Sequence, residues 1–336
     1  MKLRQQILGT ARRIVVKLGT GLLTDDANRL SRARVEELAG QVVGLCRQQR
    51  QVVVVSSGAI AAGMAALGLK QRPKPLHELQ ACAAIGQSKL MAIYDNAFGQ
   101  HGIVVAQVLL THDDLKHRDR HLNARNTLLE LLARGVVPVI NENDTVAVDE
   151  IKFGDNDRLG ALTTTLLDAD LLIILSHVEG LLDEDGNLIS VVSSVTREIE
   201  ALAGGTDRVT SVGGMKSKIE AAKIVTRSGI PMIISNTLTG SEAGTLFLPK
   251  TGKLASRKRW IAFFQKPAGI LVVDDGARAA LCDAGKSLLA KGVVRTEGKP
   301  AVGDVVSIQD TRGVEFARGL MRDGSVMVHR DDLVIL

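Results

Sequence analysis

A lysine followed by a glycine-rich turn is the first feature of the sequence whose residue types suit chemistry. Lys17 lies near the end of the apolar run RIVVKL, and Gly19-Thr20-Gly21 follow that run. Glycines let a backbone approach phosphate oxygens closely, and a lysine ammonium supplies a compact positive charge for them. Taken alone, the pattern also fits a lysine whose stem covers a strand end beside a tight turn. Lys17 and Gly19 are therefore candidates for holding a phosphate.

Further lysines stand at the start of a helical segment. Gly213-Gly214 precede the stretch Met215-Lys216-Ser217-Lys218, and Gly229 is expected to end the helix. Cations in a first helical turn oppose the helix dipole, so two lysines there indicate an anion that offsets the repulsion. A lysine-rich loop without a ligand is the alternative.

Carboxylates and carboxamides gather in two other stretches. Asn141-Glu142-Asn143-Asp144 follow an apolar run, and Gly154-Asp155-Asn156-Asp157 open a helical segment. Capping a helix needs only one acid. So many acceptors at the edge of a sheet suit a polar zwitterion or the orientation of cationic partners. An Asx-rich turn without a ligand is the structural alternative.

The stretch QVVVVSSGAIAAG joins a strand to a helix without a spacer. Ser57 and Gly58 fall at the start of that helix, where unpaired N–H groups and the helix dipole favour a carboxylate or a phosphate. The alternative is that Ser56 or Ser57 only caps the helix.

These polar residues follow predicted strands. Residues 13–236 alternate strand-like apolar runs with helical stretches, including a helix expected over 32–47, and the run DLLIILS ends at Ser176-His177. The alternation predicts an α/β fold with a mostly parallel sheet covered by helices on both faces. Ligands of such folds bind at the carboxyl ends of the strands, which are the expected site.

The sequence changes character past Asn236. A linker-like stretch, TGKLASRKRWIAF, leads to residues 268–336, which contain short strands, glycines and one short helix near 277–283. This pattern is typical of a small β-rich barrel. The predicted domains therefore span residues 1–255 and 256–336.

Composition sets bounds on the class of protein. The 336 residues are 45% hydrophobic with a net charge of +5, which fits a folded protein with local basic sites. No signal peptide or membrane span is predicted, so a cytoplasmic protein without a membrane partner is expected. Cys46, Cys82 and Cys282 are widely spaced, which suits reduced thiols. One Trp and one Tyr leave few platforms for stacking nucleic-acid bases.

Two tempting motifs fail. DAGKS at 283–287 lacks a P-loop glycine, because Ala280 stands in its place. His112, His117 and His121 lie in one charged stretch, and the latter two could share a helix face, but no further ligand accompanies them. No protein metal ligand is predicted.

Seven stretches together resemble the amino acid kinase family, in the order found in its glutamate-phosphorylating members. They are VVKLGTGLLT, SSGAIAAG, GQSKLM, LNARNTL, PVINENDTVA, GDNDRLGAL and GGMKSKIEAA. INEND followed by GDND is the most specific part. Residues from about 258 onward, with VDDGARAAL, GKSLLAKGV and VGDVVSI, resemble a PUA domain. The resemblance implies a three-layer αβα sandwich followed by a small PUA barrel.

The resemblance also implies ATP-dependent phosphorylation of the side-chain carboxylate of L-glutamate to γ-glutamyl phosphate, the first step of proline biosynthesis. Lys17 and Lys218 resemble the lysines that neutralise the phosphates, and Asp157 resembles the aspartate that orients them. Ser57, with Gly58 beside it, Asp144 and Asn156 resemble the glutamate-binding positions. We expect Asp144 to accept from the ammonium group, and Asn156 and the Ser57 turn to meet the carboxylate end.

The nucleotide-binding positions follow from the same motifs. They are Lys17, Gly19, Ser176, His177, Gly213, Gly214, Met215, Lys216, Ser217 and Lys218. Ser176-His177 replace a common Thr-Asp pair, and Val212 stands where a threonine often precedes Gly213. The implied partners are MgATP, with Mg²⁺ on the nucleotide, proline as a feedback inhibitor, and further copies of the chain in a dimer or tetramer.

Two alternatives stay open at this point. One is another member of the same fold that acts on carbamate, aspartate or a nucleoside monophosphate. The other is an RNA-binding protein that acts through the PUA domain, since Arg257, Lys258 and Arg259 precede that domain.

Overall fold

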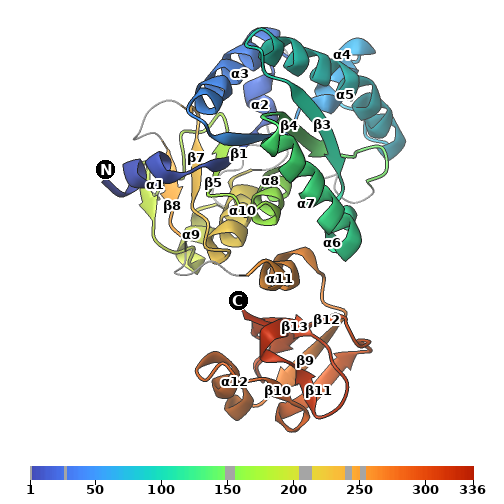
Figure 1. The fold of residues 1–336 in the computed structure, drawn as a ribbon, viewed down its shortest axis with the longest axis vertical. Coiled ribbons are helices and arrows are strands. Elements are labelled where there is room, and N and C mark those ends of the chain that lie inside the picture. The colour runs from blue at the N-terminus through green and yellow to red at the C-terminus, as the bar shows by residue number, and fades with distance from the viewer. Residues whose placement is uncertain (1, 26–28, 148–155, 204–213, 239–243, 250–254) are drawn as a thin grey trace. The chain divides into compact units, whose positions relative to one another are not determined.

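An eight-stranded, mostly parallel sheet organises the larger part of the chain in the computed structural model (Figure 1). The structure describes residues 2–25, 29–147, 156–203, 214–238, 244–249 and 255–336. The chain divides into two compact units, residues 1–252 and 253–336.

The strands of the large sheet lie in the order β3-β4-β2-β1-β5-β7-β8-β6. Their bounds are β1 Arg13–Leu18, β2 Gln51–Ser56, β3 Val105–Leu110, β4 Val137–Glu142, β5 Leu171–Leu175, β6 Val191–Val192, β7 Met232–Ser235 and β8 Thr245–Phe247. β8 runs antiparallel to β7, and the other pairs are parallel. The predicted mostly parallel sheet is thereby confirmed.

Helices follow most of these strands. They are α1 Lys2–Thr10, α2 Thr20–Leu23, α3 Arg32–Arg47, α4 Ala59–Ala66, α5 Leu76–Gly99, α6 His112–Lys116, α7 Arg118–Ala133, α8 Asn156–Leu166, α9 Arg197–Leu202 and α10 Met215–Arg227. The helix expected over 32–47 has these bounds, and the side chain of Ser31 accepts from the backbone N–H of Arg34 at its start.

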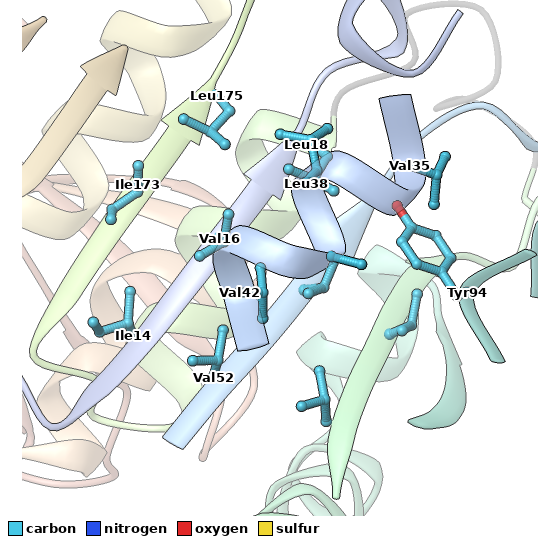
Figure 2. Packing of buried hydrophobic residues seen from close by; sticks show 14 of the residues in the cluster. Ile14, Val16, Leu18, Val35, Leu38, Val42, Val52, Tyr94, Ile173 and Leu175 are labelled. Atoms are coloured by element: carbon cyan, nitrogen blue, oxygen red, sulfur yellow. The ribbon is translucent and has the colours of Figure 1, made fainter. Parts of the chain in front are cut away.

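The two faces of β1 explain how the sheet positions a charged residue. Ile14, Val16 and Leu18 belong to a buried apolar cluster that α3 and α5 complete (Figure 2). Successive side chains of a strand point to opposite faces, so Lys17 lies on the other face, where α8 packs on β1 and α10 packs on α8. Helices thus cover the sheet on both faces, as the three-layer prediction requires.

Two glycines let α4 and α5 pack with their backbones in contact. A Cβ atom on Gly86 would lie 1.7 Å from the carbonyl oxygen of Ala59, and one on Gly63 would lie 1.8 Å from that of Cys82. No side chain fits these distances. The close crossing of α4 and α5 fixes α5 beside the turn after β2, which carries Ser57.

Replacing Gly86 by alanine is therefore expected to destabilise the fold. The added methyl group can be accommodated only by moving backbone, so we expect a fall in Tm of roughly 5–10 °C. Gly99→Ala on the same helix is the matched control, because nothing lies within 4 Å of its Cβ position. That variant should melt at the wild-type temperature or slightly above it. Equal melting temperatures for the two variants, measured by circular dichroism, would contradict the close crossing.

The second unit is a small β-rich module, as predicted. A five-stranded sheet has the order β11-β9-β12-β13-β15, and β10 pairs with β14. The elements are α11 Ser256–Arg259, a π-helical turn Trp260–Phe264, β9 Gly269–Val273, α12 Asp275–Cys282, β10 Leu288–Leu289, β11 Val293–Gly298, β12 Val305–Gln309, β13 Glu315–Leu320, β14 Val326–Val328 and β15 Leu333–Ile335, with 3₁₀ turns at Ala290–Gly292 and Arg330–Asp332. The short helix begins at Asp275 because the side chain of Asp274 accepts from the N–H of Ala277.

The linker prediction for TGKLASRKRWIAF is wrong over its second half. Residues 256–264 are helical, and Ile261 and Ala262 are buried against Val305 and Val334 of the second unit. Apolar residues in this stretch therefore join the core of the module instead of connecting two domains loosely.

Candidate active site

Two lysines share one carboxylate beside the end of β1. Lys17 Nζ lies 2.6 Å from Asp157 Oδ1, and Lys218 Nζ lies 3.1 Å from Asp157 Oδ2. β1, the first turn of α8 and the first turn of α10 supply these three residues. All three are buried, with exposed fractions of 6%, 2% and 6% for Lys17, Asp157 and Lys218. We call Lys17, Asp157 and Lys218 the lysine centre.

The lysine centre brings two ammonium groups to one carboxylate. Burial alone would raise the pKa of Asp157, but the ammonium groups of Lys17 and Lys218 outweigh that effect and hold this pKa at about 2. Two buried cations side by side attract an anion, so the centre is suited to hold a phosphate.

The start of α10 contributes a hydroxyl group to the same centre. Ser217 Oγ lies 2.6 Å from Asp157 Oδ2 and 2.9 Å from the carbonyl oxygen of Gly214. Met215 is half-buried, whereas Lys216 is exposed. The structure therefore brings Ser217 and Lys218 to the centre but leaves Lys216 away from Asp157, and Gly213 lies outside the described residues.

The end of β5 runs beside the end of β1. The N–H of Gly19 donates to the carbonyl oxygen of Leu175, and a Cβ atom on Gly19 would lie 3.2 Å from that oxygen and 3.7 Å from Lys17 Nζ. A side chain at Gly19 would thus crowd the lysine centre. Ser176 is buried and its N–H donates to the carbonyl oxygen of Ser235, whereas His177 is exposed.

The turn after β2 joins the centre through Asn156. Gly58 has φ 102°, in the left-handed region, and starts α4 without a side-chain cap. The alternative that Ser56 or Ser57 only caps α4 is therefore wrong. Instead, Asn156 Nδ2 lies 3.0 Å from Ser57 Oγ, 2.9 Å from the carbonyl oxygen of Ser56 and 3.1 Å from Asn141 Oδ1.

Asp144 follows β4 and lines a cavity. The cavity has a volume of about 310 Å³ and is lined by Ala83, Ala84, Gln87, Ser88, Gln107, Leu109, Glu142, Asn143, Asp144 and Thr145. Burial, and next the negative charge of Glu142, raise the pKa of Asp144 to about 7, although Arg72 partly offsets this. Asp144 therefore titrates near neutral pH.

Gln87 is a cavity residue that the sequence analysis does not single out. It lies in the stretch GQSKLM, which carries part of the family resemblance. Its side chain is buried and accepts a hydrogen bond from Asn141 Nδ2. Asn141 Oδ1 in turn accepts from Asn156 Nδ2. Two hydrogen bonds therefore connect Gln87 to Asn156, the residue that precedes Asp157.

The histidines of residues 112–121 do not form a shared helix face. His117 precedes the first residue of α7, and His121 is buried with its Nδ1 3.2 Å from the carbonyl oxygen of Leu115. Within the described ranges, no three His, Cys, Asp or Glu side chains are grouped to hold a metal ion. No helix there is long and apolar enough to cross a membrane.

The basic cluster before the second module is partly neutralised. Arg257 Nη2 lies 2.7 Å from Asp332 Oδ1, and Arg259 is buried with an exposed fraction of 4%. Lys258 is half-buried. The Arg257 side chain stays 55% exposed, but its ion pair and the burial of Arg259 reduce the positive charge that this cluster offers to RNA phosphates.

Models of two families match the chain. The amino acid kinase family matches residues 12–236, and the PUA domain matches residues 269–327. Carbamate kinase from Giardia lamblia bound to AMP-PNP has a TM-score of 0.51 and 18% sequence identity, covering 72% of this chain and 99% of that one. At this identity the likeness shows the fold alone.

Curated relatives are much more similar. A glutamate 5-kinase of Pelobacter propionicus is 44% identical over an alignment of 373 positions, covering 99% of this chain and 100% of the relative. A glutamate 5-kinase of Geobacter metallireducens is 46% identical with the same coverage. One from Moorella thermoacetica is 44% identical over 98% of this chain and 97% of its own length.

Proposed function

This chain belongs to the amino acid kinase family and, within it, to the glutamate 5-kinases, and we propose that its lysine centre is where the phosphoryl group is transferred. The activity is ATP-dependent phosphorylation of the side-chain carboxylate of L-glutamate, the first step of proline biosynthesis. The observation that carries the proposed site is the meeting of two buried lysines at one buried carboxylate.

The chemistry needs alignment and charge neutralisation more than proton transfer. An oxygen of the glutamate γ-carboxylate attacks the γ-phosphorus of ATP, and the bond from that phosphorus to the leaving oxygen of ADP breaks. The nucleophile is already ionised at neutral pH, so the reaction requires no general base. Lys17 and Lys218 neutralise charge on the phosphates as it shifts, while Asp157 fixes the positions of both ammonium groups.

The contacts of Asn156 change which group of glutamate we expect this residue to bind. Its Nδ2 already donates within the protein, which leaves Oδ1 as an acceptor. We therefore propose that Asn156 Oδ1 and Asp144 accept from the substrate ammonium. Ser57 Oγ accepts from Asn156 and keeps its own hydrogen to donate to the γ-carboxylate.

The nucleotide is proposed to bind at the start of α10, with its phosphates between Lys17 and Lys218. Both oxygens of Asp157 are engaged by lysines, and Ser217 shares one of them. Asp157 is therefore a poor direct ligand for Mg²⁺, and phosphate oxygens and water suit that ion better. Mg²⁺ bound to ATP supplies charge neutralisation. Inhibition by proline and a dimer or tetramer remain proposals from the family resemblance. A cytoplasmic location and the division into residues 1–255 and 256–336 remain predictions from the sequence pattern.

The acceptor is tested by trapping the product with hydroxylamine. We expect hydroxamate and ADP from MgATP with L-glutamate, and little with aspartate, N-acetylglutamate or UMP. Turnover with one of the other acceptors and none with glutamate would overturn the proposed substrate. Sequence-selective RNA binding at nanomolar Kd without any turnover would favour the RNA-binding alternative.

Glutamate binding is expected to weaken as pH falls through about 7. Asp144 has a raised pKa, so it becomes neutral below pH 7 and loses its attraction for the substrate ammonium. Below that pH, kcat/KM for glutamate should fall by up to about tenfold per pH unit. The measurement is a series of kcat/KM values between pH 5.5 and 8.5, with KM for ATP as an internal reference.

Asp144→Asn provides the control for this titration. The variant should have a high KM for glutamate at every pH and should lose the inflection near pH 7. An inflection that persists in the variant would assign the titration to another group and contradict the role of Asp144.

A further inference from the structure

A hydrogen bond from the backbone of β4 makes it possible to assign the oxygen and the nitrogen of the Gln87 side-chain amide. The N–H of Glu142 donates to Asn141 Oδ1 over 2.9 Å, which identifies the acceptor end of the Asn141 amide. Asn141 Nδ2 must then be the group that donates to Gln87 Oε1, also over 2.9 Å. It follows that Nε2 is the part of Gln87 left to reach the cavity.

Gln87 Nε2 is a buried donor that needs an acceptor. The residue is 9% exposed and lines the cavity, and Nε2 has no hydrogen-bond partner among the residues that the structure describes. Buried polar groups are nearly always satisfied, so such a group indicates a ligand or water at that place. A second buried atom of the same cavity, Glu142 Oε1, makes no hydrogen bond to a described residue and lies 3.7 Å from His112 Nδ1.

The cavity therefore combines a neutral donor with two carboxylates. Gln87 Nε2 suits a carboxylate, whereas Asp144 and Glu142 suit an ammonium group. These are the two groups on the α-carbon of a free amino acid. The hydrogen-bonded chain from Gln87 through Asn141 to Asn156 connects this cavity to the neighbour of Asp157.

We propose that Gln87 is a substrate-binding residue whose Nε2 donates to the α-carboxylate of glutamate. The inference rests on the proposed function, and it places the α-carbon end of the substrate in the cavity and the γ-carboxylate toward Ser57 and the lysine centre. It gives the site a means of choosing free amino acids over derivatives that lack the α-carboxylate.

The test combines a variant with a substrate analogue. 4-Aminobutyrate keeps the γ-carboxylate and the ammonium group of glutamate but has a hydrogen in place of the α-carboxylate. Gln87→Met keeps the length of the side chain and removes its donor. We expect KM for glutamate to rise about 10- to 100-fold and KM for 4-aminobutyrate to rise less than about threefold, with KM for ATP unchanged.

The analogue separates direct contact from an effect through Asn141. Gln87→Met also removes the acceptor of Asn141 Nδ2, and a disturbance passed on to Asn156 would raise KM for both substrates equally. An equal rise, or an unchanged KM for glutamate, would overturn the proposal. Lys89→Met is the matched control, since Lys89 also lies on α5 but is exposed and does not line the cavity, and it should alter neither KM by more than about twofold.

A second variant covers the case in which Gln87→Met does not fold, and the wild type tests the proposed function separately from the role of Gln87. If thermal melting shows that Gln87→Met does not fold, Gln87→Asn withdraws the amide by one methylene and should raise KM for glutamate selectively in the same way. Wild-type protein that forms no hydroxamate from glutamate would refute the proposed function itself. Wild-type activity with an unselective Gln87 variant would refute only the assignment of Gln87.

Discussion

Lys218→Met is expected to lower kcat about 10²- to 10³-fold while the protein keeps its fold, because the variant loses one of two charges that stabilise the transferring phosphoryl group. Methionine preserves most of the apolar stem of lysine. Asp157 would keep its contact of 2.6 Å with Lys17, so the substitution leaves no buried carboxylate without a partner. The measurements are kcat from ADP release at saturating glutamate and MgATP, and Tm.

Lys223→Met is the control for this experiment. Lys223 lies on the same helix, α10, but its Nζ contacts Glu200 Oε2 at 2.6 Å and not Asp157. Its loss should change kcat by less than about twofold, since a partly exposed ion pair contributes little. Equal kcat values for Lys218→Met and the wild type would remove Lys218 from the mechanism.

Asp157→Asn is expected to destabilise the protein as well as inactivate it. The variant keeps the shape of the side chain but removes the carboxylate that two buried ammonium groups share. Breaking a buried ion pair in this way costs about 3–5 kcal/mol, which corresponds to a fall in Tm of roughly 6–20 °C. We also expect kcat to fall about 10²-fold or more, because the lysines are no longer held in place.

An added anion distinguishes the loss of the Asp157 charge from general damage to the fold. Inorganic phosphate should raise Tm more for Asp157→Asn than for the wild type, because the anion replaces the missing negative charge. Asp95→Asn, an exposed change on α5, should leave both Tm and kcat unaltered. A full wild-type Tm for Asp157→Asn would contradict the charge balance described for the lysine centre.

The same balance gives the wild type an acid-sensitive contribution to stability. The pKa of Asp157 is lowered to about 2 in the fold. Its stabilisation is therefore fully present above the unfolded pKa of about 3.9 and is lost as pH falls through 2.

The frame of the fold could be predicted because its elements are encoded locally. The valine run of β2 has no polar alternation, which indicates a strand buried on both faces, and Ser31 marks the start of α3. The failed linker prediction is instructive. Basic residues 257–259 suggested an exposed connection, but the apolar residues that follow them are buried in the second module.

The site could be predicted only in part, because it joins distant residues. Lys218 and Asp157 are 61 positions apart, and no local pattern states that they pair. The difference between Lys216 and Lys218 was accessible in principle: residues two apart on a helix point to different faces, so both could not reach Asp157. Gln87 was missed because a single glutamine among alanines on a helix has no pattern of its own, and its role depends on Asn141 of β4.

The most direct test of the account follows an oxygen atom from glutamate to phosphate. Glutamate labelled with oxygen-18 in its γ-carboxylate is incubated with MgATP and hydroxylamine, and the released phosphate is analysed by mass spectrometry. If the γ-carboxylate attacks the γ-phosphorus, hydroxylamine then cleaves the acyl bond and each released phosphate carries one labelled oxygen. Phosphate without the label, formed at the same rate as ADP, would mean that water is the nucleophile and would contradict the proposed transfer.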